Sequence, residues 1–381
     1  MVLPALLSVA CGSKQDALLD ARFKGVDSAN VYISASPLAM ADSVLYDTVR
    51  MTGGRFCWNP SLTSPTEVHV VVDKDVRVRN GRASVPASHQ VVFLAMPGEK
   101  IRLDARYEDG FLAYDLTGSG DLQTQSGLRN AAKSLYVKSQ ILADQIAEEL
   151  EEGYENADEK YLDSLYALRA GLSQSIRQAS LSYVQDNPDN LMSAFFLLQN
   201  PEPDTFLAYY DKLDASVRDG ILKERLDKMK AASEHRLLLR ANDAKLVPGS
   251  VAPAFSLTGL DGKAVSLADY TDKYVVLDFW GTWCPWCVKG IPQMKEYYAK
   301  HKGKVVFISI ACRDKVEKVR AMVEKEGIAW INVMNGTAEN DVALSYGVSG
   351  FPTKVLLEPG LRVKAKYLGE VPEFYRDLDA L

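Results

Sequence analysis

The feature that most constrains the fold is the stretch of residues 274 to 287, YVVLDFWGTWCPWC. Its first seven residues form an apolar run that is interrupted only by Asp278, and such a run is typical of a strand buried on both faces. A short loop follows, and Pro285 then suits the first turn of a helix, which we expect to span residues 285 to 301. The sequence therefore predicts a buried strand, a short loop and a helix that begins at a pair of cysteines.

Strand and helix patterns alternate from this point to the end of the chain. We expect further strands at residues 304–312, 329–333, 353–358 and 362–368, and helices at 314–326, at 341–346 and after Pro372. Two strand–helix–strand runs followed by a hairpin predict a central sheet covered by helices. Because the Pro- and Gly-containing linker KLVPGSVAP precedes this pattern, we place an α/β domain at residues 248–381.

The N-terminal part of the chain divides into a strand-rich and a helix-rich stretch. Between residues 30 and 116, short alternating segments separated by turns predict an antiparallel β-sandwich, which we assign to residues 18–118. Residues 119–245 are rich in Ala, Leu, Glu and Lys and predict a helical region. One helix that begins near Asp158 carries an apolar stripe at helical spacing, which is either bundle core or a docking face.

Length and charge narrow the classes of function. The 381 residues are enough for two or three domains. The formal net charge is −6, and no basic run appears that could neutralise a phosphate backbone. We therefore expect no nucleic-acid partner.

The first residues, MVLPALLSVACGS, resemble a signal peptide that ends in a lipobox. The apolar run from residue 2 to 10 is too short to span a bilayer and is followed by Cys11. The resemblance implies cleavage before Cys11 and a lipid on this residue, so we assign residues 1–11 to the signal. Ser8 stands where a lipobox prefers Leu, and no Lys or Arg precedes the run, so an ordinary secretory signal is the alternative.

The cysteine pair admits three interpretations: metal ligands, a structural staple or a reactive centre. A closed zinc site needs four ligands, and a second C-x-x-C or a paired-histidine motif is missing from the sequence, so we expect no metal. A structural disulfide across so short a loop constrains little chain entropy. We expect two further cysteines, Cys57 and Cys312, to be separate buried thiols.

The reactive interpretation fits the placement of the pair. Cys284 falls at the start of the predicted helix, where unpaired backbone N–H groups and the helix dipole lower the pKa of a thiol. Cys287 lies one turn further in and can attack a mixed disulfide formed at Cys284. We therefore expect Cys284 to be the nucleophile and Cys287 the resolving thiol of a redox-active disulfide that needs no cofactor.

Two motifs, VVLDFWGTWCPWC and then YGVSGFPTKVLL, resemble the thioredoxin fold across roughly residues 250 to 381. The resemblance implies a cis peptide bond between Phe351 and Pro352 that faces the dithiol. It also implies that Asp278 is a buried carboxylate that takes the proton of Cys287 during exchange. The residues expected to bind the client around the disulfide are Trp283, Pro285, Trp286, Phe351 and Pro352.

Residues 252 to 267, APAFSLTGLDGKAVSL, are similar to the TlpA/ResA-like branch of membrane-tethered bacterial thioredoxins. The similarity implies a lipid-anchored protein on the periplasmic side of the cell envelope, with disulfide-containing client proteins and a membrane thiol reductase as electron donor. Members that act in cytochrome c maturation often carry a Glu three residues after the second cysteine, where this chain has Gly290. Residues 18–245 loosely resemble the β-plus-helical modules of envelope thioredoxin lipoproteins, through GGRFCWN and FLAMPGEKIRL.

Three functional hypotheses follow from these patterns. We favour a thiol–disulfide oxidoreductase that reduces client disulfides, because Pro285 and Trp286 place no His beside Cys284 and a weakly stabilised thiolate belongs to a more reducing couple. A thiol peroxidase would need a P-x-x-x-T-x-x-C loop, and no proline stands at that spacing before Cys284. The third hypothesis is a client-binding or scaffolding lipoprotein with incidental redox activity, which the long N-terminal part without catalytic motifs motivates.

Overall fold

The computed structural model describes residues 17–38, 44–79, 81–151, 153, 156–200, 202–337 and 340–381. The chain forms two compact units, Met1–Ser233 and Glu234–Leu381. The predicted signal segment, with Cys11, lies outside the described residues. The division of the sequence into segments 1–11, 18–118, 119–245 and 248–381 stays a prediction.

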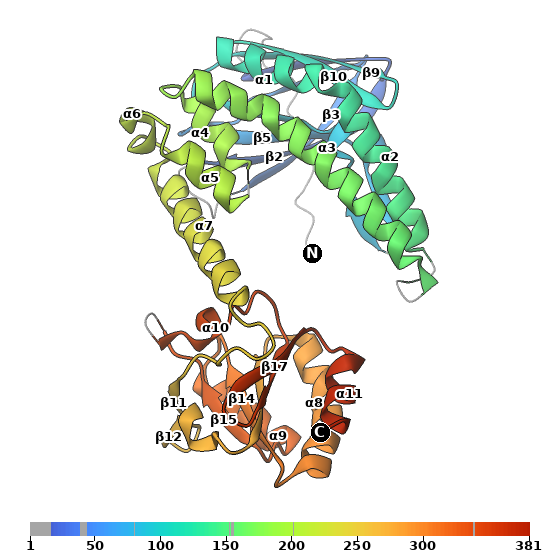
Figure 1. Cartoon of the computed structure of the whole chain (residues 1–381). Helices are drawn as coiled ribbons and strands as arrows, with labels where there is room; N and C mark the ends of the chain where they lie inside the picture. The colour runs from blue at the N-terminus through green and yellow to red at the C-terminus, as the bar shows by residue number, and fades with distance from the viewer. Residues whose placement is uncertain are drawn as a thin grey trace. The chain divides into compact units, whose positions relative to one another are not determined.

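The first unit is built on one eight-stranded sheet in the order β10-β9-β1-β4-β3-β2-β5-β8 (Figure 1). Its strands are β1 (Leu19–Lys24), β2 (Ser28–Pro37), β3 (Leu45–Thr52), β4 (Arg55–Trp58), β5 (Thr66–Val72), β8 (Val91–Ala95), β9 (Ile101–Glu108) and β10 (Phe111–Thr117). A separate hairpin pairs β6 (Arg77–Arg79) with β7 (Arg82–Ser84). Short 3-10 helices span Asp73–Asp75 and Ala87–His89.

Each strand predicted between residues 30 and 116 is present, which confirms a strand-rich region. The sequence did not predict β1, whose buried Leu19, Ala21 and Phe23 alternate with less buried residues. β1 pairs in parallel with β9, so the expectation of a purely antiparallel sheet was wrong at this pair. A parallel pair needs a long connection, and the chain from β2 to β8 provides it. The eight strands of the main sheet form one continuous ladder, and their arrangement as a sandwich stays a prediction.

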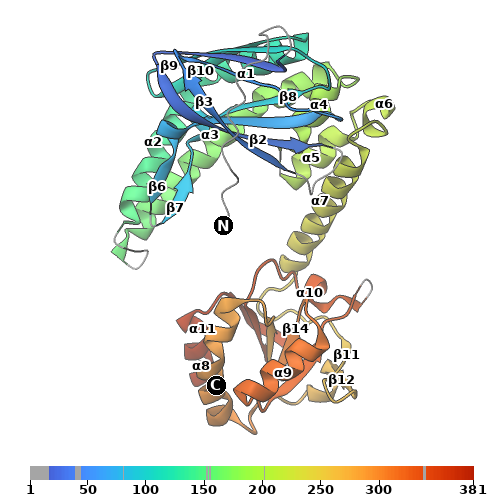
Figure 2. The ribbon, with the colours of Figure 1, turned by 180° about the vertical axis from the view of Figure 1, so that it is seen from behind.

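Helices follow the sheet in the first unit, and α1, α3, α4 and α5 lie on one side of it, behind the strands in Figure 2. The helices are α1 (Gly120–Ala131), α2 (Lys133–Glu149), α3 (Glu159–Asp186), α4 (Leu191–Leu198), α5 (Pro203–Tyr210), α6 (Ala215–Arg218) and α7 (Lys223–Asp243), whose residues from Glu234 onward belong to the second unit. Phe195 and Leu197 of α4 are buried in one cluster with Leu94 of β8. Across the described ranges, no helix has the length and apolar character needed to cross a membrane.

The apolar stripe of α3 is core only in part. The helix begins where it was predicted, with the Asp158 carboxylate accepting from the Tyr161 N–H. Its buried residues are Leu162, Leu165, Leu181 and Val184. In contrast, Tyr161 and Leu168 of the predicted stripe are 43% and 60% exposed. The buried residues of α3 therefore lie near its two ends, but exposed residues occur at its start as well as in its middle.

The second unit has a five-stranded sheet in the order β15-β14-β13-β16-β17. The strands are β13 (Tyr274–Trp280), β14 (Val305–Ala311), β15 (Ile331–Met334), β16 (Thr353–Glu358) and β17 (Arg362–Leu368). The helices are α8 (Pro285–His301), α9 (Val316–Glu326), α10 (Val342–Ser345) and α11 (Pro372–Asp379). The hairpin β11 (Ser256–Thr258) and β12 (Ala264–Ser266) and a 3-10 helix at Leu267–Tyr270 precede β13. Every strand and helix predicted after residue 273 is present, which confirms the α/β architecture.

Strand β13 lies at the centre of this sheet, parallel to β14 and antiparallel to β16. Its side chains alternate between the two faces of the sheet. Val275, Leu277 and Phe279 pack with α10 and the β11–β12 hairpin, whereas Val276 and Trp280 pack with α8, α9 and α11. Asp278 shares the parity of this second set, so the strand directs its side chain toward α8.

Candidate active site

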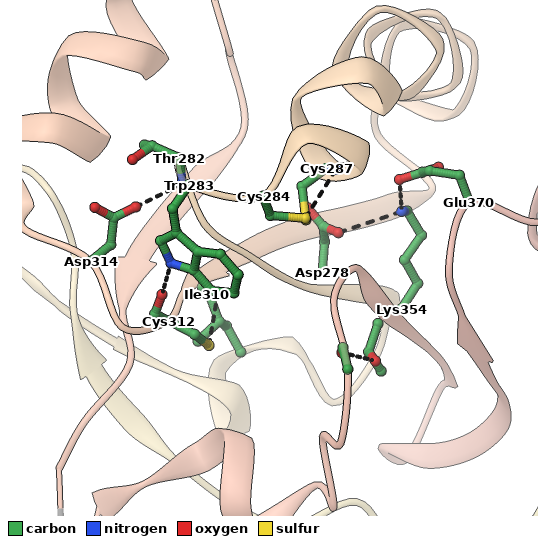
Figure 3. Close-up of a disulfide and its surroundings, with 12 residues drawn as sticks. Asp278, Thr282, Trp283, Cys284, Cys287, Ile310, Cys312, Asp314, Lys354 and Glu370 are labelled. Carbon is green, nitrogen blue, oxygen red and sulfur yellow. Dashed lines mark hydrogen bonds and ion pairs between the residues drawn. A yellow bond between two sulfur atoms is a disulfide. The ribbon is translucent and has the colours of Figure 1, made fainter. Parts of the chain in front are cut away.

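Cys284 and Cys287 form a disulfide at the start of α8 (Figure 3). Cys284 is the N-cap residue and Pro285 occupies the first turn, where the missing N–H of proline costs no hydrogen bond. The Cys287 N–H donates to the Cys284 sulfur at 3.2 Å. The helix end therefore directs a backbone donor at the sulfur that the sequence predicts to be the nucleophile.

An aromatic platform, formed by Trp283 and Phe351, lies beside the disulfide. Trp283 is 47% exposed, and its indole N–H donates to the Cys312 carbonyl at 3.0 Å. The Trp283 and Phe351 rings meet edge to face, with their centroids 5.2 Å apart. Gly281 permits this arrangement, because a Cβ at that position would lie 2.5 Å from the Trp283 Nε1. A small residue in the loop thus fixes where the platform stands.

The other residues predicted to bind the client differ in exposure. Trp286 is exposed, and the Lys289 Nζ lies 5.2 Å from the centre of its ring. Pro285 is also exposed, whereas Pro352 is buried. The Phe351–Pro352 peptide bond is cis, as the resemblance to thioredoxin implies. The predicted set therefore offers exposed rings at the helix start and a buried proline behind Phe351.

Asp278 belongs to a row of polar side chains that crosses three strands beneath the disulfide. The register places it between Ser309 of β14 and Lys354 of β16. The Ser309 hydroxyl donates to Asp278 Oδ2 at 2.8 Å, and the Lys354 Nζ lies 3.7 Å from Asp278 Oδ1. The Trp330 indole N–H donates a hydrogen bond to the Ser309 hydroxyl oxygen at 2.8 Å. Asp278 is 8% exposed, which confirms the predicted burial.

Glu370, which follows β17, completes a charged group that we name the Asp278–Lys354–Glu370 cluster (Figure 3). Glu370 Oε1 lies 2.5 Å from the Lys354 Nζ, and Oε2 accepts from the Tyr375 hydroxyl at 3.1 Å. The carboxylate lies against Gly290 of α8, where an added Cβ would collide with it. A cavity of about 10 Å³ is lined by the three members of the cluster together with Cys287 and Gly290, among others.

Burial sets the protonation of these groups. It raises the pKa of Asp278 above its usual range, while the Lys354 ammonium and the Ser309 hydroxyl act to lower it. Burial also raises the pKa of Tyr375, so this phenol stays protonated and donates to Glu370. A carboxyl group with a raised pKa is suited to accept a proton near neutral pH.

Cys312 and Cys57 were both predicted to be buried thiols. Cys312 is a buried thiol, and burial raises its pKa to about 12. Cys57 is half-buried, so the prediction of burial was wrong for it. The reason is the alternation along β4, where Phe56 and Trp58 point into the core and Cys57 points to the other face.

Three polar residues of this site were not predicted from the sequence: Ser309, Lys354 and Glu370. Ser309 and Lys354 interrupt the apolar strands VVFISIA and TKVLLE. Because charged and hydroxyl side chains are seldom fully buried without a partner, each interruption was a usable signal. Glu370 follows a strand in a turn, where charged residues are ordinary, so only the folded chain reveals its contact with α8.

Comparisons with known proteins identify the family to which the second unit is similar. Residues 248–366 match the model of the AhpC/TSA family. The thiol-disulfide oxidoreductase ResA of Bacillus thuringiensis strain Al Hakam is 35% identical over 132 residues, which cover 34% of this chain and 75% of that protein. The chain belongs to the ResA-like family of thioredoxin-fold thiol–disulfide oxidoreductases.

Further relatives have the same description. ResA of Bacillus subtilis strain 168 is 31% identical over 134 residues, which cover 35% of this chain and 74% of that protein. Among solved structures, the thioredoxin domain of a thiol-disulfide oxidoreductase from Bacteroides vulgatus is 31% identical and matches with a TM-score of 0.33, covering 35% of this chain and 97% of that one. In this ResA-like oxidoreductase, the residues that match the AhpC/TSA model lie within the second unit, which also contains the disulfide of α8.

Proposed function

We propose that this oxidoreductase reduces disulfides of client proteins through Cys284 and Cys287. The Cys284 thiolate attacks one sulfur of the client disulfide, which forms a mixed disulfide and releases the other client sulfur as a thiolate. Cys287 then gives its proton to Asp278 and attacks the Cys284 sulfur. This step forms the Cys284–Cys287 disulfide and releases the second client sulfur. Two electrons pass to the client, whose two thiolates take up two protons.

The observation that carries this proposal is the position of Cys284 at the N-cap of α8. The N–H of Cys287 points at the Cys284 sulfur, and the positive end of the helix dipole lies beside it. Both interactions favour a thiolate over a thiol. Asp278 shares a cavity with Cys287 rather than with Cys284, which supports the proposal that it is the base for Cys287.

We propose that the direction of electron flow is reducing. Pro285 and Trp286, between the two cysteines, bring no positive charge to the Cys284 thiolate. A less stabilised thiolate belongs to a more reducing couple, so we expect a reduction potential near that of thioredoxin, about −270 mV. A value near about −120 mV, which is characteristic of a strong oxidant, would reverse the proposed direction.

Client recognition is assigned to the surface around the disulfide. Trp283 and Trp286 are 47% and 63% exposed, and large exposed aromatic side chains are the residues that most often anchor a protein partner. Phe351 braces Trp283 from the side. We propose that an extended client segment lies over this platform, along the backbone that precedes Pro352.

We propose that the protein acts on the periplasmic side of the cell envelope and that a lipid on Cys11 anchors it. The apolar start that ends at Cys11 supports this location. A redox disulfide such as Cys284–Cys287 also suits an oxidising compartment. A membrane thiol reductase would then return electrons to the Cys284–Cys287 disulfide, with residues 248–381 as the redox domain and residues 18–118 and 119–245 outside the chemistry.

Single-turnover reduction of a disulfide-containing protein tests the mechanism. Reduced wild type is compared with Cys284→Ser, Cys287→Ser and, as a matched control, Cys312→Ser. We expect Cys284→Ser to be inactive, Cys287→Ser to stop at a mixed disulfide, and Cys312→Ser to behave as wild type. Reduction by Cys284→Ser at the wild-type rate would refute the mechanism. Consumption of hydrogen peroxide in preference to the protein disulfide would instead favour a peroxidase.

A further inference from the structure

The Asp278–Lys354–Glu370 cluster holds more charge than the exchange reaction requires. Asp278 alone is needed to accept the Cys287 proton, yet an ammonium and a second carboxylate line the same cavity. Burying charged groups is costly even when they are paired. An apolar residue at position 354 would fill the core without that cost, so the function of Lys354 and Glu370 needs an explanation.

Figure 3 shows the Lys354 ammonium in contact with both carboxylates, that of Asp278 beside the dithiol and that of Glu370 beside α8. Lys354 lies between the carboxylates, with its Nζ 3.7 Å from Asp278 Oδ1 and 2.5 Å from Glu370 Oε1. The side chains of Asp278, Lys354 and Glu370 are 12%, 2% and 20% exposed. Glu370 is therefore the member with the greatest access to solvent, while Asp278 faces the cavity that Cys287 lines.

The Glu370 carboxylate can lie next to α8 because the helix has a glycine, Gly290, at the point of contact. Gly290 is three residues after Cys287 and therefore lies on the same face of the helix, one turn further on. A Cβ at Gly290 would collide with the Glu370 carboxylate. A residue distant in sequence thus fills the space that a side chain of α8 would otherwise occupy.

We propose that Glu370 is a positioning residue that carries a proton between solvent and Asp278 by way of Lys354. This inference rests on the proposed function. When Asp278 has taken the Cys287 proton, the Lys354 ammonium gives one proton to the Glu370 carboxylate and takes the proton of Asp278. Lys354 stays charged, Asp278 becomes a carboxylate again, and the Glu370 carboxyl releases the proton to water. No additional oxidant or reductant enters the step.

The titratable groups around Glu370 come from four elements. They are Lys354 on β16, Asp278 on β13, Tyr375 on α11, and Cys287 and Tyr297 on α8. Tyr297 packs on Tyr375, with the ring centroids 4.6 Å apart. Burial raises the pKa of both Tyr375 and Tyr297, so neither phenol titrates near neutral pH. The Cys287 thiol and the Asp278 carboxyl that takes its proton are left to produce the pH dependence.

The test measures the two half-reactions separately in the whole chain. Alkylation of Cys284 in the reduced protein reports the first, and release of a client protein from its mixed disulfide with Cys284 reports the second. For Glu370→Gln we expect client release to slow by roughly tenfold at neutral pH, less than the about 10²–10⁴-fold contribution of a directly acting acid or base, because Glu370 acts through Lys354. Alkylation of Cys284 should stay at the wild-type rate. The deficit should shrink as pH rises, because hydroxide then removes the Cys287 proton directly.

Two further variants distinguish proton transfer from a loss of structure. The double variant Gly290→Asp/Glu370→Ala removes the carboxylate of Glu370 and introduces one on α8, next to the position that the Glu370 carboxylate occupied. We expect client release to recover relative to Glu370→Ala. Glu373→Gln changes a more exposed carboxylate of α11 that pairs with Arg376, and it should match wild type in both half-reactions. Thermal unfolding of each variant checks that it is folded.

The outcomes separate this inference from the function on which it rests. Wild-type rates of client release by Glu370→Gln across the pH range would overturn the relay and leave the reductase intact. Equal slowing of both half-reactions, without recovery in the double variant, would also overturn it, since a structural role produces that pattern. A wild type that reduces no client would instead remove the proposed function itself.

Discussion

Asp278 and Lys354 face each other across the β13–β16 pair, with Oδ1 and Nζ 3.7 Å apart in the core of the second unit. The Lys354 ammonium also contacts Glu370, so one positive charge balances two carboxylates. Charges in a protein core are tolerated when they are paired and hydrogen-bonded. The electrostatics beneath the disulfide therefore depend on Lys354, and the following expectations test that dependence and the geometry around it.

Asp278→Asn should stabilise the oxidised protein relative to wild type as pH rises. Burial raises the pKa of Asp278 above its ordinary value of 3.8. At pH values between the ordinary pKa, which applies to the unfolded chain, and the raised pKa of the folded chain, the folded state binds more protons than the unfolded state. Wild-type stability therefore falls as pH increases through this window. Asn does not titrate, so the difference in free energy of unfolding should grow by about 1.4 kcal/mol for each unit of the shift.

Urea denaturation of the two oxidised proteins at a series of pH values, from acid to neutral, measures this difference. It should be constant below the ordinary pKa of Asp278, rise through the window and then level off. A difference that is the same at every pH would mean that the Asp278 carboxyl titrates alike in the folded and unfolded chain.

Lys354→Met should be strongly destabilising at neutral pH. It leaves the carboxylates of Asp278 and Glu370 in the core without their ammonium, and removing one partner of a buried pair costs about 3–5 kcal/mol. Lys364→Met, on the neighbouring strand β17, breaks a half-buried pair with Glu358 and should cost about 1 kcal/mol or less. Adding Asp278→Asn to Lys354→Met should restore part of the loss. Chemical denaturation checks the series, and comparable losses for the two lysine variants would contradict the assigned importance of Lys354.

Gly281→Ala should weaken client binding through Trp283. The new methyl group would lie 2.5 Å from the indole Nε1, so the ring must leave its contact with Phe351 and its hydrogen bond to the Cys312 carbonyl. Overpacking of this kind costs about 1–3 kcal/mol, and we expect it as a higher KM for a disulfide-containing protein with little change in kcat. Gly171→Ala is the matched control, because an added Cβ there meets no neighbouring atom. Steady-state kinetics compare the two, and an unchanged KM for Gly281→Ala would show that the platform does not bind the client.

The Cys312 thiol should resist alkylation in the folded, reduced protein. With its pKa raised by burial to about 12, only on the order of one thiol in 10⁴ is ionised at pH 8, and the thiolate is the reactive form. Iodoacetamide should therefore modify Cys284 first and reach Cys312 only after unfolding. Peptide mass spectrometry of native and denatured samples measures this order. Rapid modification of Cys312 in the native sample would show that its surroundings open.

The local pattern after residue 273 was sufficient to predict the strands and helices that follow, although the β11–β12 hairpin before them was not predicted. The apolar run at residues 274–280, the proline after Cys284 and the alternation that follows were each read correctly, because helix and strand periodicity and turn chemistry are local properties of the sequence. The same reasoning missed β1, which pairs in parallel with β9, a strand that begins more than 70 residues later. Pairing over that distance leaves no mark in a short window of sequence.

The sequence by itself determined the cysteine pair, its place at a helix start and the burial of Asp278, since all three follow from residue types within one stretch of chain. Tertiary structure alone decided what surrounds that carboxylate. The register of three strands places Ser309 and Lys354 beside Asp278, and the turn after β17 brings Glu370 into the space at Gly290. Electrostatic interactions act through space, so the residues that tune this site could be identified only once the chain was folded.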